Sequence, residues 1–193
     1  MKKDIILAGV GGQGILSIAA CIGMAALDEG LFLKQAEVHG MSQRGGAVQS
    51  HLRISSEEIA SDLIPEGKVD LIIAVEPMES LRYIPMLHPT GWIITSITPF
   101  NNIPDYPDIE LILKEIWKQP HYVTLDADTV AKDCGSIKAA NMVILGAASP
   151  FLGLKPGSIE NAIRKIFDGK GEDVILLNIK ALQHGRAFAL KNM

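Results

Sequence analysis

Residues 5–14 read IILAGVGGQG, and this stretch decides the fold class. Four apolar residues that run into glycines are typical of a short buried strand ending in a tight turn. Residues 13–28 follow with many Ala, Ile, Leu and Met side chains and predict a helix, which Gly30 can end. A strand, a glycine turn and a helix in this order open an α/β domain.

The rest of the chain continues this alternation. Further strands are expected at residues 31–38, 47–54, 69–75, 92–96 and 122–125. The strand at residues 47–54 alternates apolar and polar side chains, which predicts that it is half exposed. Helices are expected at residues 78–87, 111–118, 139–148, 158–167 and 174–191, with one more that Asp126 caps. We therefore predict a single domain over residues 1–193, whose fold class is α/β with a doubly wound, mostly parallel, Rossmann-like sheet and a helical C-terminal region.

The glycine turn matches the dinucleotide-binding fingerprint, with Gly9, Gly11 and Gly14 at its first, third and sixth positions. Glycines let the backbone turn tightly and let an anion approach the free N–H groups at the positive end of the helix. Gly12 and Gln13 complete this candidate binding site. The fingerprint alone indicates a tight turn as much as a ligand, so a structural or interface role stays open.

The polar segment that begins with Glu37 reads EVHGMSQRGG. It leaves the second strand at its carboxyl end, which in a parallel sheet is the same edge as the glycine turn. Glu37 stands about where a ribose-binding acid would lie in a dinucleotide-binding fold. The other candidates are His39, Ser42, Gln43 and Arg44, of which the arginine suits a carboxylate or phosphate. A solvated loop whose arginine pairs with a nearby acid is the alternative.

Glu76 is a further candidate at the same edge, because it follows the buried strand at residues 69–75. A Glu-Pro pair is also an effective way to end a strand and begin a helix. A structural role for Glu76 therefore stays open beside a functional one.

Composition narrows the function classes. Hydrophobic residues make up 48% and charged residues 21%, as in a folded globular protein. The net charge of −4 and the pI near 5.7 argue against a nucleic-acid partner. No signal sequence or membrane span is visible, because Asp4 interrupts the N-terminal apolar run, and the cytoplasm is the expected location.

Metal and redox centres are not expected in this chain. It has only two cysteines, Cys21 and Cys134, which are far apart in sequence and are expected to be buried, reduced thiols. The histidines have no ligand spacing: His51, His88, His121 and His184 are scattered.

Two motifs together resemble a known family. GGQG at residues 11–14 and HGMSQRGG at residues 39–46 are similar to the gamma domain of 2-oxoacid:ferredoxin oxidoreductases. Among these, the chain looks most like the small (beta) subunit of the indolepyruvate type. The resemblance extends along nearly the whole chain, including residues 75–77 and 141–146. The first motif is unspecific and the second is highly specific.

The resemblance implies a non-cofactor subunit of a multichain enzyme, inactive in isolation. A large (alpha) partner subunit would hold thiamine diphosphate, Mg and the iron–sulfur clusters, convert an indolepyruvate or other arylpyruvate to an acyl-CoA with coenzyme A as co-substrate, and reduce ferredoxin. Such a chain needs no membrane. The hypothesis for this domain is that the glycine turn and the Arg44 loop close the active site or shape the coenzyme A path. Arg44→Ala would then change the Michaelis constant for coenzyme A or the turnover.

Two further hypotheses stay open. One is a stand-alone NAD(P)-binding Rossmann oxidoreductase, although no paired Tyr and Lys on one helix supports it. The other is an assembly module without a ligand. The isolated chain could also form a homodimer through a surface that a partner would otherwise cover.

Overall fold

The computed structural model describes residues 1–38, 45–101 and 103–193. Its strands are β1 (Lys2–Val10), β2 (Phe32–Val38), β3 (Ala47–Ser55), β4 (Val69–Ala74), β5 (Leu87–Ser96) and β6 (Tyr122–Leu125). Its α-helices are α1 (Ile15–Asp28), α2 (Pro77–Leu81), α3 (Ile109–Trp117), α4 (Ala127–Cys134), α5 (Ala140–Ala148), α6 (Pro156–Phe167) and α7 (Glu172–Asn192). Short 3₁₀ turns are η2 (Ile84–Met86), η3 (Ile137–Ala139), η4 (Ser149–Phe151) and η5 (Asp168–Lys170).

The strands form one sheet in the order β2-β3-β1-β4-β5-β6. β1, β4, β5 and β6 pair in parallel, whereas β3 is antiparallel to both β1 and β2. Among the described strands β3 alone therefore runs against the others, and β2 points the same way as β1. The predicted mostly parallel sheet is confirmed, with one inserted antiparallel strand.

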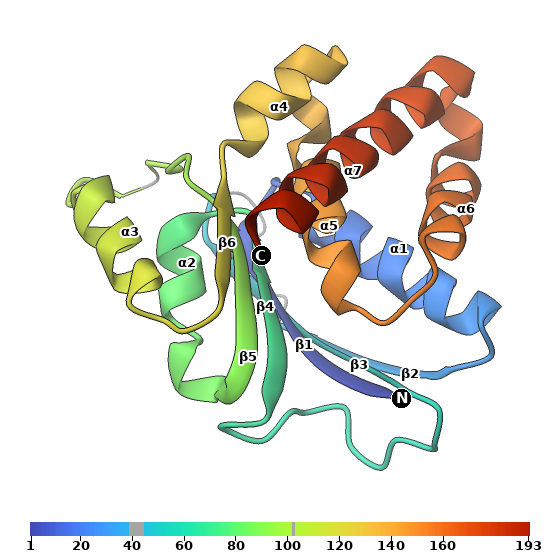
Figure 1. The fold of residues 1–193 in the computed structure, drawn as a ribbon, viewed down its shortest axis with the longest axis horizontal. Helices are drawn as coiled ribbons and strands as arrows, with labels where there is room; N and C mark the ends of the chain where they lie inside the picture. Colours follow the sequence, from blue (N-terminus) through green and yellow to red (C-terminus); the bar gives the residue numbers. More distant parts are fainter. Residues whose placement is uncertain (39–44, 102) are drawn as a thin grey trace.

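Helices cover both faces of the sheet, as a doubly wound fold requires (Figure 1). Alternate residues of β1 point to opposite faces. Ile5 and Leu7 belong to the core beneath α1, α4, α5, α6 and α7, whereas Ile6 and Ala8 belong to the core beneath α2 and α3. Because both faces are covered, β1 is a continuous apolar run without the alternation of a half-exposed strand.

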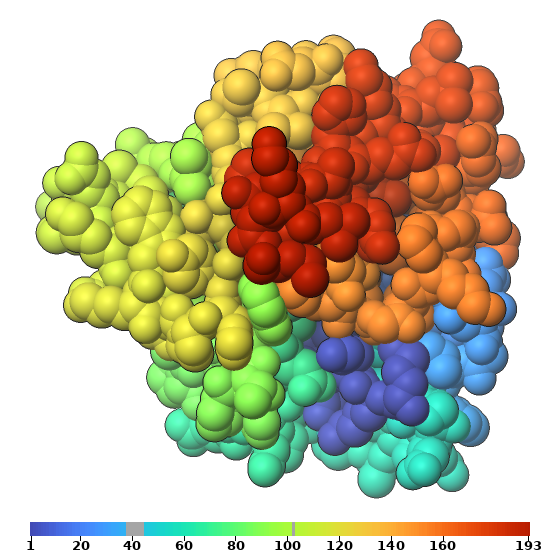
Figure 2. Space-filling model, viewed as in Figure 1, coloured from blue at the N-terminus to red at the C-terminus, as the bar shows by residue number. Residues whose placement is uncertain are grey.

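The C-terminal helices form the thicker of the two layers. α5 packs on β4 and β5, and α7 packs along α5. Figure 2 shows the C-terminal end of α7 at the centre of the visible face. The predicted helical C-terminal region is confirmed, and it is part of the same core as the sheet.

Two expectations from the sequence are wrong. The strand expected to be half exposed is β3, in which residues 50–55 are all buried, because the segment after it covers the polar face. Arg53 donates to the carbonyls of Ser61 and Leu63, at 2.9 Å each. The single helix expected at residues 78–87 is divided, because α2 ends at Leu81 and Pro85 lies in the separate turn η2.

No helix in the described part of the chain combines the length and the apolarity needed to cross a membrane.

Candidate functional site

The glycine turn joins β1 to α1 at the carboxyl edge of the sheet. Gly12 and Gly14 have φ values of 101° and 80°, a left-handed region that favours glycine. The Gln13 side chain closes the turn from inside, because its Oε1 accepts a 2.8 Å hydrogen bond from the Val10 N–H. The Gln13 N–H in turn donates to the Val10 carbonyl at 3.1 Å. Two hydrogen bonds between Gln13 and Val10 thus hold the turn.

Two of the candidate glycines serve the fold. The Gly11 N–H donates to the Gly46 carbonyl at 2.8 Å, and the Gly11 carbonyl accepts from the Gly45 N–H at 3.2 Å, which extends the pairing of β1 with β3. A Cβ on Gly9 would lie 2.5 Å from Cγ2 of Val75. Packing against Val75 therefore explains why position 9 is a glycine, and the Gly11 N–H, already paired, is not available to an anion.

Three other N–H groups at the turn are available. Within the described residues, those of Gly12, Gly14 and Ile15 donate to no acceptor. Gly14 is the N-cap of α1 and brings no capping side chain. The start of a helix carries partial positive charge on such N–H groups, which makes this end of α1 suited to an anion.

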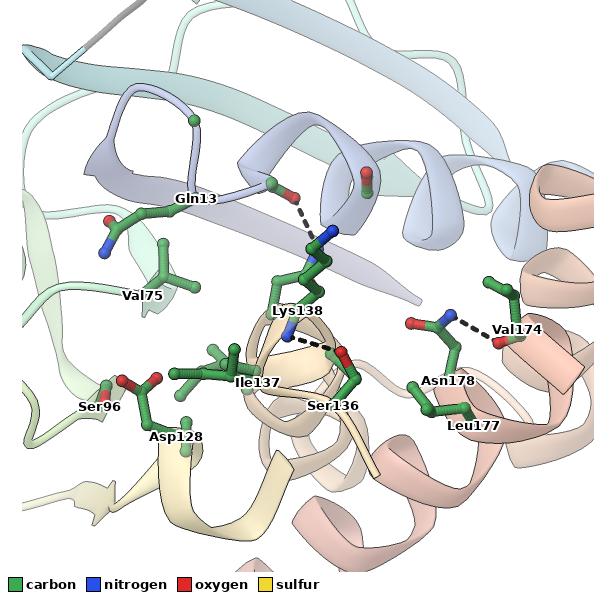
Figure 3. Close-up of a pocket in the computed structure, with 18 of the residues that line it drawn as sticks. Gln13, Val75, Ser96, Asp128, Ser136, Ile137, Lys138, Val174, Leu177 and Asn178 are labelled. Carbon is green, nitrogen blue, oxygen red and sulfur yellow. Dashed lines mark hydrogen bonds between the residues drawn. The ribbon is translucent and has the colours of Figure 1, made fainter. Parts of the chain in front are cut away.

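A cavity of about 850 Å³ opens beside the turn (Figure 3). Four helices begin at its wall: α1 at Gly14, α4 at Ala127, α5 at Ala140 and α7 near Val174. The first turns of all four helices reach this one cavity, and the positive end of a helix favours a negatively charged group. Asp126 caps α4, and Glu172 and Asp173 lie in the first turn of α7, so the uncapped start of α1 contributes most to this preference.

Charged side chains add to this preference. Lys138 and Lys170 line the cavity and are exposed, and in Figure 3 Lys138 extends toward the start of α1. Asp128 is the one acid among the described lining residues. Burial, and next the charge of Asp126, raises the pKa of the Asp128 carboxyl. Asp126 itself caps α4. Its carboxylate accepts a 2.9 Å hydrogen bond from the Thr129 N–H, and this bond lowers the pKa of Asp126.

The rest of the wall is mainly apolar. Its larger apolar side chains are Val75, Phe100, Ile137, Ile144, Phe167, Val174 and Leu177. Asn178 is buried among them and donates through Nδ2 to the Val174 carbonyl at 2.7 Å. Figure 3 shows its oxygen on the side away from Val174. The cavity can therefore hold a ligand with an anionic part and a longer, weakly polar part.

The structure separates Glu37 from the glycine turn. Glu37 is on β2, and β3 lies between β2 and β1, so Glu37 is two strand spacings, about 10 Å, from β1. Its carboxylate accepts a hydrogen bond from Gln35 Nε2 on the same strand. The arrangement expected of a ribose-binding acid is therefore not present.

The polar loop that carries the specific motif lies outside the described residues. His39, Ser42, Gln43 and Arg44 all fall in this part of the chain. The described residues on either side of it, the end of β2 and Gly45, lie at the same sheet edge as the glycine turn.

Glu76 is fully buried and holds neighbouring segments together. Its Oε2 accepts from the Glu79 N–H at 2.8 Å and thereby caps α2. Its Oε1 accepts from the Tyr106 hydroxyl and from the Phe100 N–H at 3.4 Å. Burial is the main reason why the pKa of the Tyr106 phenol is raised, and its hydrogen bond to Glu76 is the second. Glu76 thus fixes the segment that carries Phe100 to the cavity wall.

Sequence reasoning missed several residues of the cavity wall. Lys138, Lys170, Asp128 and Asn178 belong to separate helices and turns of the C-terminal half. No spacing in the sequence connects them. The capping residue Asp126 gave the one local signal that a helix begins at this edge.

The fold and the cavity define a class of protein: a doubly wound α/β domain with an anion-adapted glycine turn. Within that class, the chain belongs to the pyruvate ferredoxin/flavodoxin oxidoreductase family, whose model matches residues 4–188. The resemblance drawn from the two sequence motifs is confirmed.

Named relatives match over nearly the full chain. The chain is 37% identical to the indolepyruvate oxidoreductase subunit IorB of Archaeoglobus fulgidus, covering 96% of this chain and 94% of that protein. It is 36% identical to the IorB subunit of Thermococcus kodakarensis, covering 96% and 95%.

Solved structures agree in fold. The 2-oxoglutarate:ferredoxin oxidoreductase of Magnetococcus marinus, solved with 2-oxoglutarate, coenzyme A and succinyl-CoA, matches with a TM-score of 0.80 at 24% identity, covering 98% of this chain and 31% of that chain. The keto/oxoacid ferredoxin oxidoreductase gamma subunit of Geobacter sulfurreducens matches with a TM-score of 0.72 at 24% identity, covering 98% and 99%.

Proposed function

We propose that this chain is the small subunit of a 2-oxoacid ferredoxin oxidoreductase of the indolepyruvate type. The observation that carries the proposal is the similarity to IorB subunits along nearly the full length of both chains. The substrate class, an indolepyruvate or another arylpyruvate, follows from those names. The enzyme oxidatively decarboxylates the 2-oxoacid and passes electrons to ferredoxin.

The partner is a large subunit that holds the thiamine diphosphate, Mg and iron–sulfur clusters. The cysteines of this chain and its described metal-ligating residues support this division, because they do not suit an iron–sulfur cluster or a metal ion. Cys21 and Cys134 are both buried, and burial raises the pKa of the Cys21 thiol to about 12, so it is not a thiolate ligand at neutral pH. Within the described residues, no group of three or more His, Cys, Asp or Glu side chains could hold a metal.

The role of this chain is to receive the phosphate-bearing part of coenzyme A, the co-substrate. Three features of the cavity support this role: the free N–H groups at Gly12, Gly14 and Ile15, the four helix starts, and the cations Lys138 and Lys170. The N–H groups and ammonium groups hold the phosphates, while the apolar wall excludes water from the less polar part. Arg44 enters this proposal from the sequence alone.

The stand-alone NAD(P) oxidoreductase is not favoured. Its ribose-binding acid would have to lie beside the glycine turn, and β3 occupies that position. An assembly module without a ligand would have no need of converging helix starts and cations around one cavity.

Purification of the chain from its native cell under anaerobic conditions tests the proposal. We expect a large cysteine-rich subunit to copurify, and the complex to reduce ferredoxin in the presence of an arylpyruvate and coenzyme A. A solitary chain that binds NAD(H) tightly would contradict the proposal and favour the dehydrogenase.

A further inference from the structure

The side chain of Asn141 joins the starts of two helices that are far apart in sequence. Asn141 is the second residue of α5, and its Oδ1 accepts a 2.9 Å hydrogen bond from the Met142 N–H. Its Nδ2 donates to the Gly14 carbonyl at 3.2 Å, across 127 residues of sequence. One carboxamide thus serves the first turn of α5 and reaches the N-cap of α1 as well.

The carbonyl that Asn141 holds is the one on which α1 begins. It also accepts from the Ser17 N–H at 3.0 Å and from the Ile18 N–H at 3.3 Å. Its position therefore fixes the direction in which the first turn of α1 points. Gly14 has no side chain with which to fix this carbonyl itself.

The contact is also a close packing contact. A Cβ on Gly14 would lie 2.4 Å from Nδ2 of Asn141, so the carboxamide rests directly against the Gly14 Cα. Gln13 holds the opposite side of the turn through Val10. The turn is therefore held between two carboxamides, one from its own sequence and one from the C-terminal half of the chain.

We infer that Asn141 is a positioning residue for the coenzyme A site, an inference that rests on the proposed function. It orients the turn that carries the free N–H groups of Gly12, Gly14 and Ile15, and Gly12, Gly14 and Asn141 all line the cavity. Anion binding by N–H groups depends on direction, so a small rotation of the turn weakens every one of these hydrogen bonds. The C-terminal helices thereby take part in binding although they lie far from the glycine turn in sequence.

Two substitutions separate positioning from charge and from stability. Asn141→Asp is isosteric and still accepts the Met142 N–H, but it cannot donate to the Gly14 carbonyl at neutral pH. Asn141→Ala also loses the donor and adds no charge. A matched control is Asn192→Ala, because Asn192 Nδ2 donates to the Phe188 carbonyl near the end of α7 and lies outside the cavity wall.

Steady-state kinetics of the assembled enzyme give the first readout. We expect both variants at position 141 to raise the KM for coenzyme A about tenfold. A change of this size corresponds to the loss of about one hydrogen bond to the ligand. The KM for the 2-oxoacid stays unchanged, and Asn192→Ala leaves both values unchanged. Asn141→Asp has the larger effect because its charge repels phosphate.

Hydrogen exchange supplies a readout independent of turnover. Coenzyme A should slow exchange of the amides at residues 12–18 in the wild-type complex, and less so in both variants. An increase of KM in Asn141→Asp alone would assign the effect to charge and overturn the inference. A loss of thermal stability with KM unchanged would show a merely structural role and overturn it as well. A wild-type complex that does not require coenzyme A would instead refute the proposed function.

Discussion

Gly146 on α5 and Gly185 on α7 each lie against the backbone of the other helix. A Cβ on Gly146 would come 2.0 Å from the Leu182 carbonyl oxygen, and a Cβ on Gly185 would come 2.0 Å from the Val143 carbonyl oxygen. The two glycines thus allow the helices to pack at a distance that side chains would prevent. This packing holds α7, and with it Asn178, at the cavity wall.

Gly146→Ala and Gly185→Ala should each destabilise the chain. Alanine is the better helix former by about 1 kcal/mol, but the added methyl group meets backbone atoms that no rotamer change can move. We expect each variant to lower the free energy of unfolding by about 2–3 kcal/mol, as measured by urea denaturation. The double variant should lose less than the sum, because the first methyl group already separates the helices.

Gly157→Ala is the matched control for this pair. Gly157 is also helical, in α6, and a Cβ there would meet nothing within 4 Å. It should leave stability unchanged or raise it by up to about 1 kcal/mol. An equal loss of stability in all three variants would contradict the role assigned to close helix packing.

The fold class could be predicted from the sequence because local signals report it. The apolar run before Gly9 and the helical pattern after it depend only on neighbouring residues. The position of β3 could not be predicted in this way. Its insertion between β2 and β1 depends on non-local backbone pairing, such as that of Ala36 with His51 and of Ile6 with His51.

The candidate site also has a part that local sequence predicts and a part that only tertiary packing assembles. The glycine turn is a local motif and was found, whereas Asn141 and Lys138 reach it only through tertiary packing. Glu76 shows the converse, because a polar residue at the right sheet edge proves to be engaged as a helix cap. A single sequence does not distinguish a buried cap from a ligand-binding acid.

Arg53 and Asp4 form a buried ion pair at the other end of the sheet. Arg53 Nε donates to Asp4 Oδ1 at 2.7 Å, and both side chains are nearly inaccessible. We expect Arg53→Met to lower the free energy of unfolding by about 3–5 kcal/mol, because it leaves the Asp4 carboxylate without its buried partner. The midpoint of urea denaturation measures this loss.

Lys2→Ala and a double variant provide the comparison. Lys2 Nζ is 3.0 Å from Asp4 Oδ2, but the lysine side chain is 58% exposed, so its loss should cost less than about 1 kcal/mol. Adding Asp4→Leu to Arg53→Met should recover part of the stability, because it removes a buried carboxylate that only the exposed Lys2 would still pair with. A similar loss for Lys2→Ala and Arg53→Met would refute the importance of burial.

His51 should make stability depend on pH. Its Nδ1 accepts a 3.1 Å hydrogen bond from the Ile64 N–H, which requires the neutral ring. Burial lowers the pKa of His51 from its ordinary value of 6.5; the charge of Asp62 opposes this shift and that of Arg53 adds to it. The unfolded chain therefore binds this proton at a higher pH than the folded chain. The contribution of His51 is fully present above pH 6.5 and is lost as the pH falls from there toward the folded pKa.

His51→Asn isolates the contribution of His51 to the pH dependence of stability. An amide oxygen can accept a hydrogen bond from the Ile64 N–H, and it does not titrate between about pH 5 and pH 7.5. Urea denaturation between about pH 7.5 and pH 5 should show a flatter pH dependence for this variant than for the wild type. His184→Gln, at an exposed position, should keep the slope of the wild type. Equal slopes for His51→Asn and the wild type would rule out His51 as the source.

Lys138 and Lys170 should act on the phosphates of coenzyme A and not on its thiol end. We expect Lys138→Ala and Lys170→Ala each to raise the KM for coenzyme A in the assembled enzyme by about threefold to tenfold, with the larger effect at low ionic strength, since exposed charges are screened by salt. Pantetheine carries the same thiol and no phosphate, so the two variants should use it as well as the wild type does. Lys191→Ala, which removes an exposed cation outside the cavity wall, controls for net charge. If the lysine substitutions raised the KM for pantetheine as much as the KM for coenzyme A, the lysines would act on the shape of the cavity. The assignment of the lysines to the phosphates would then be refuted.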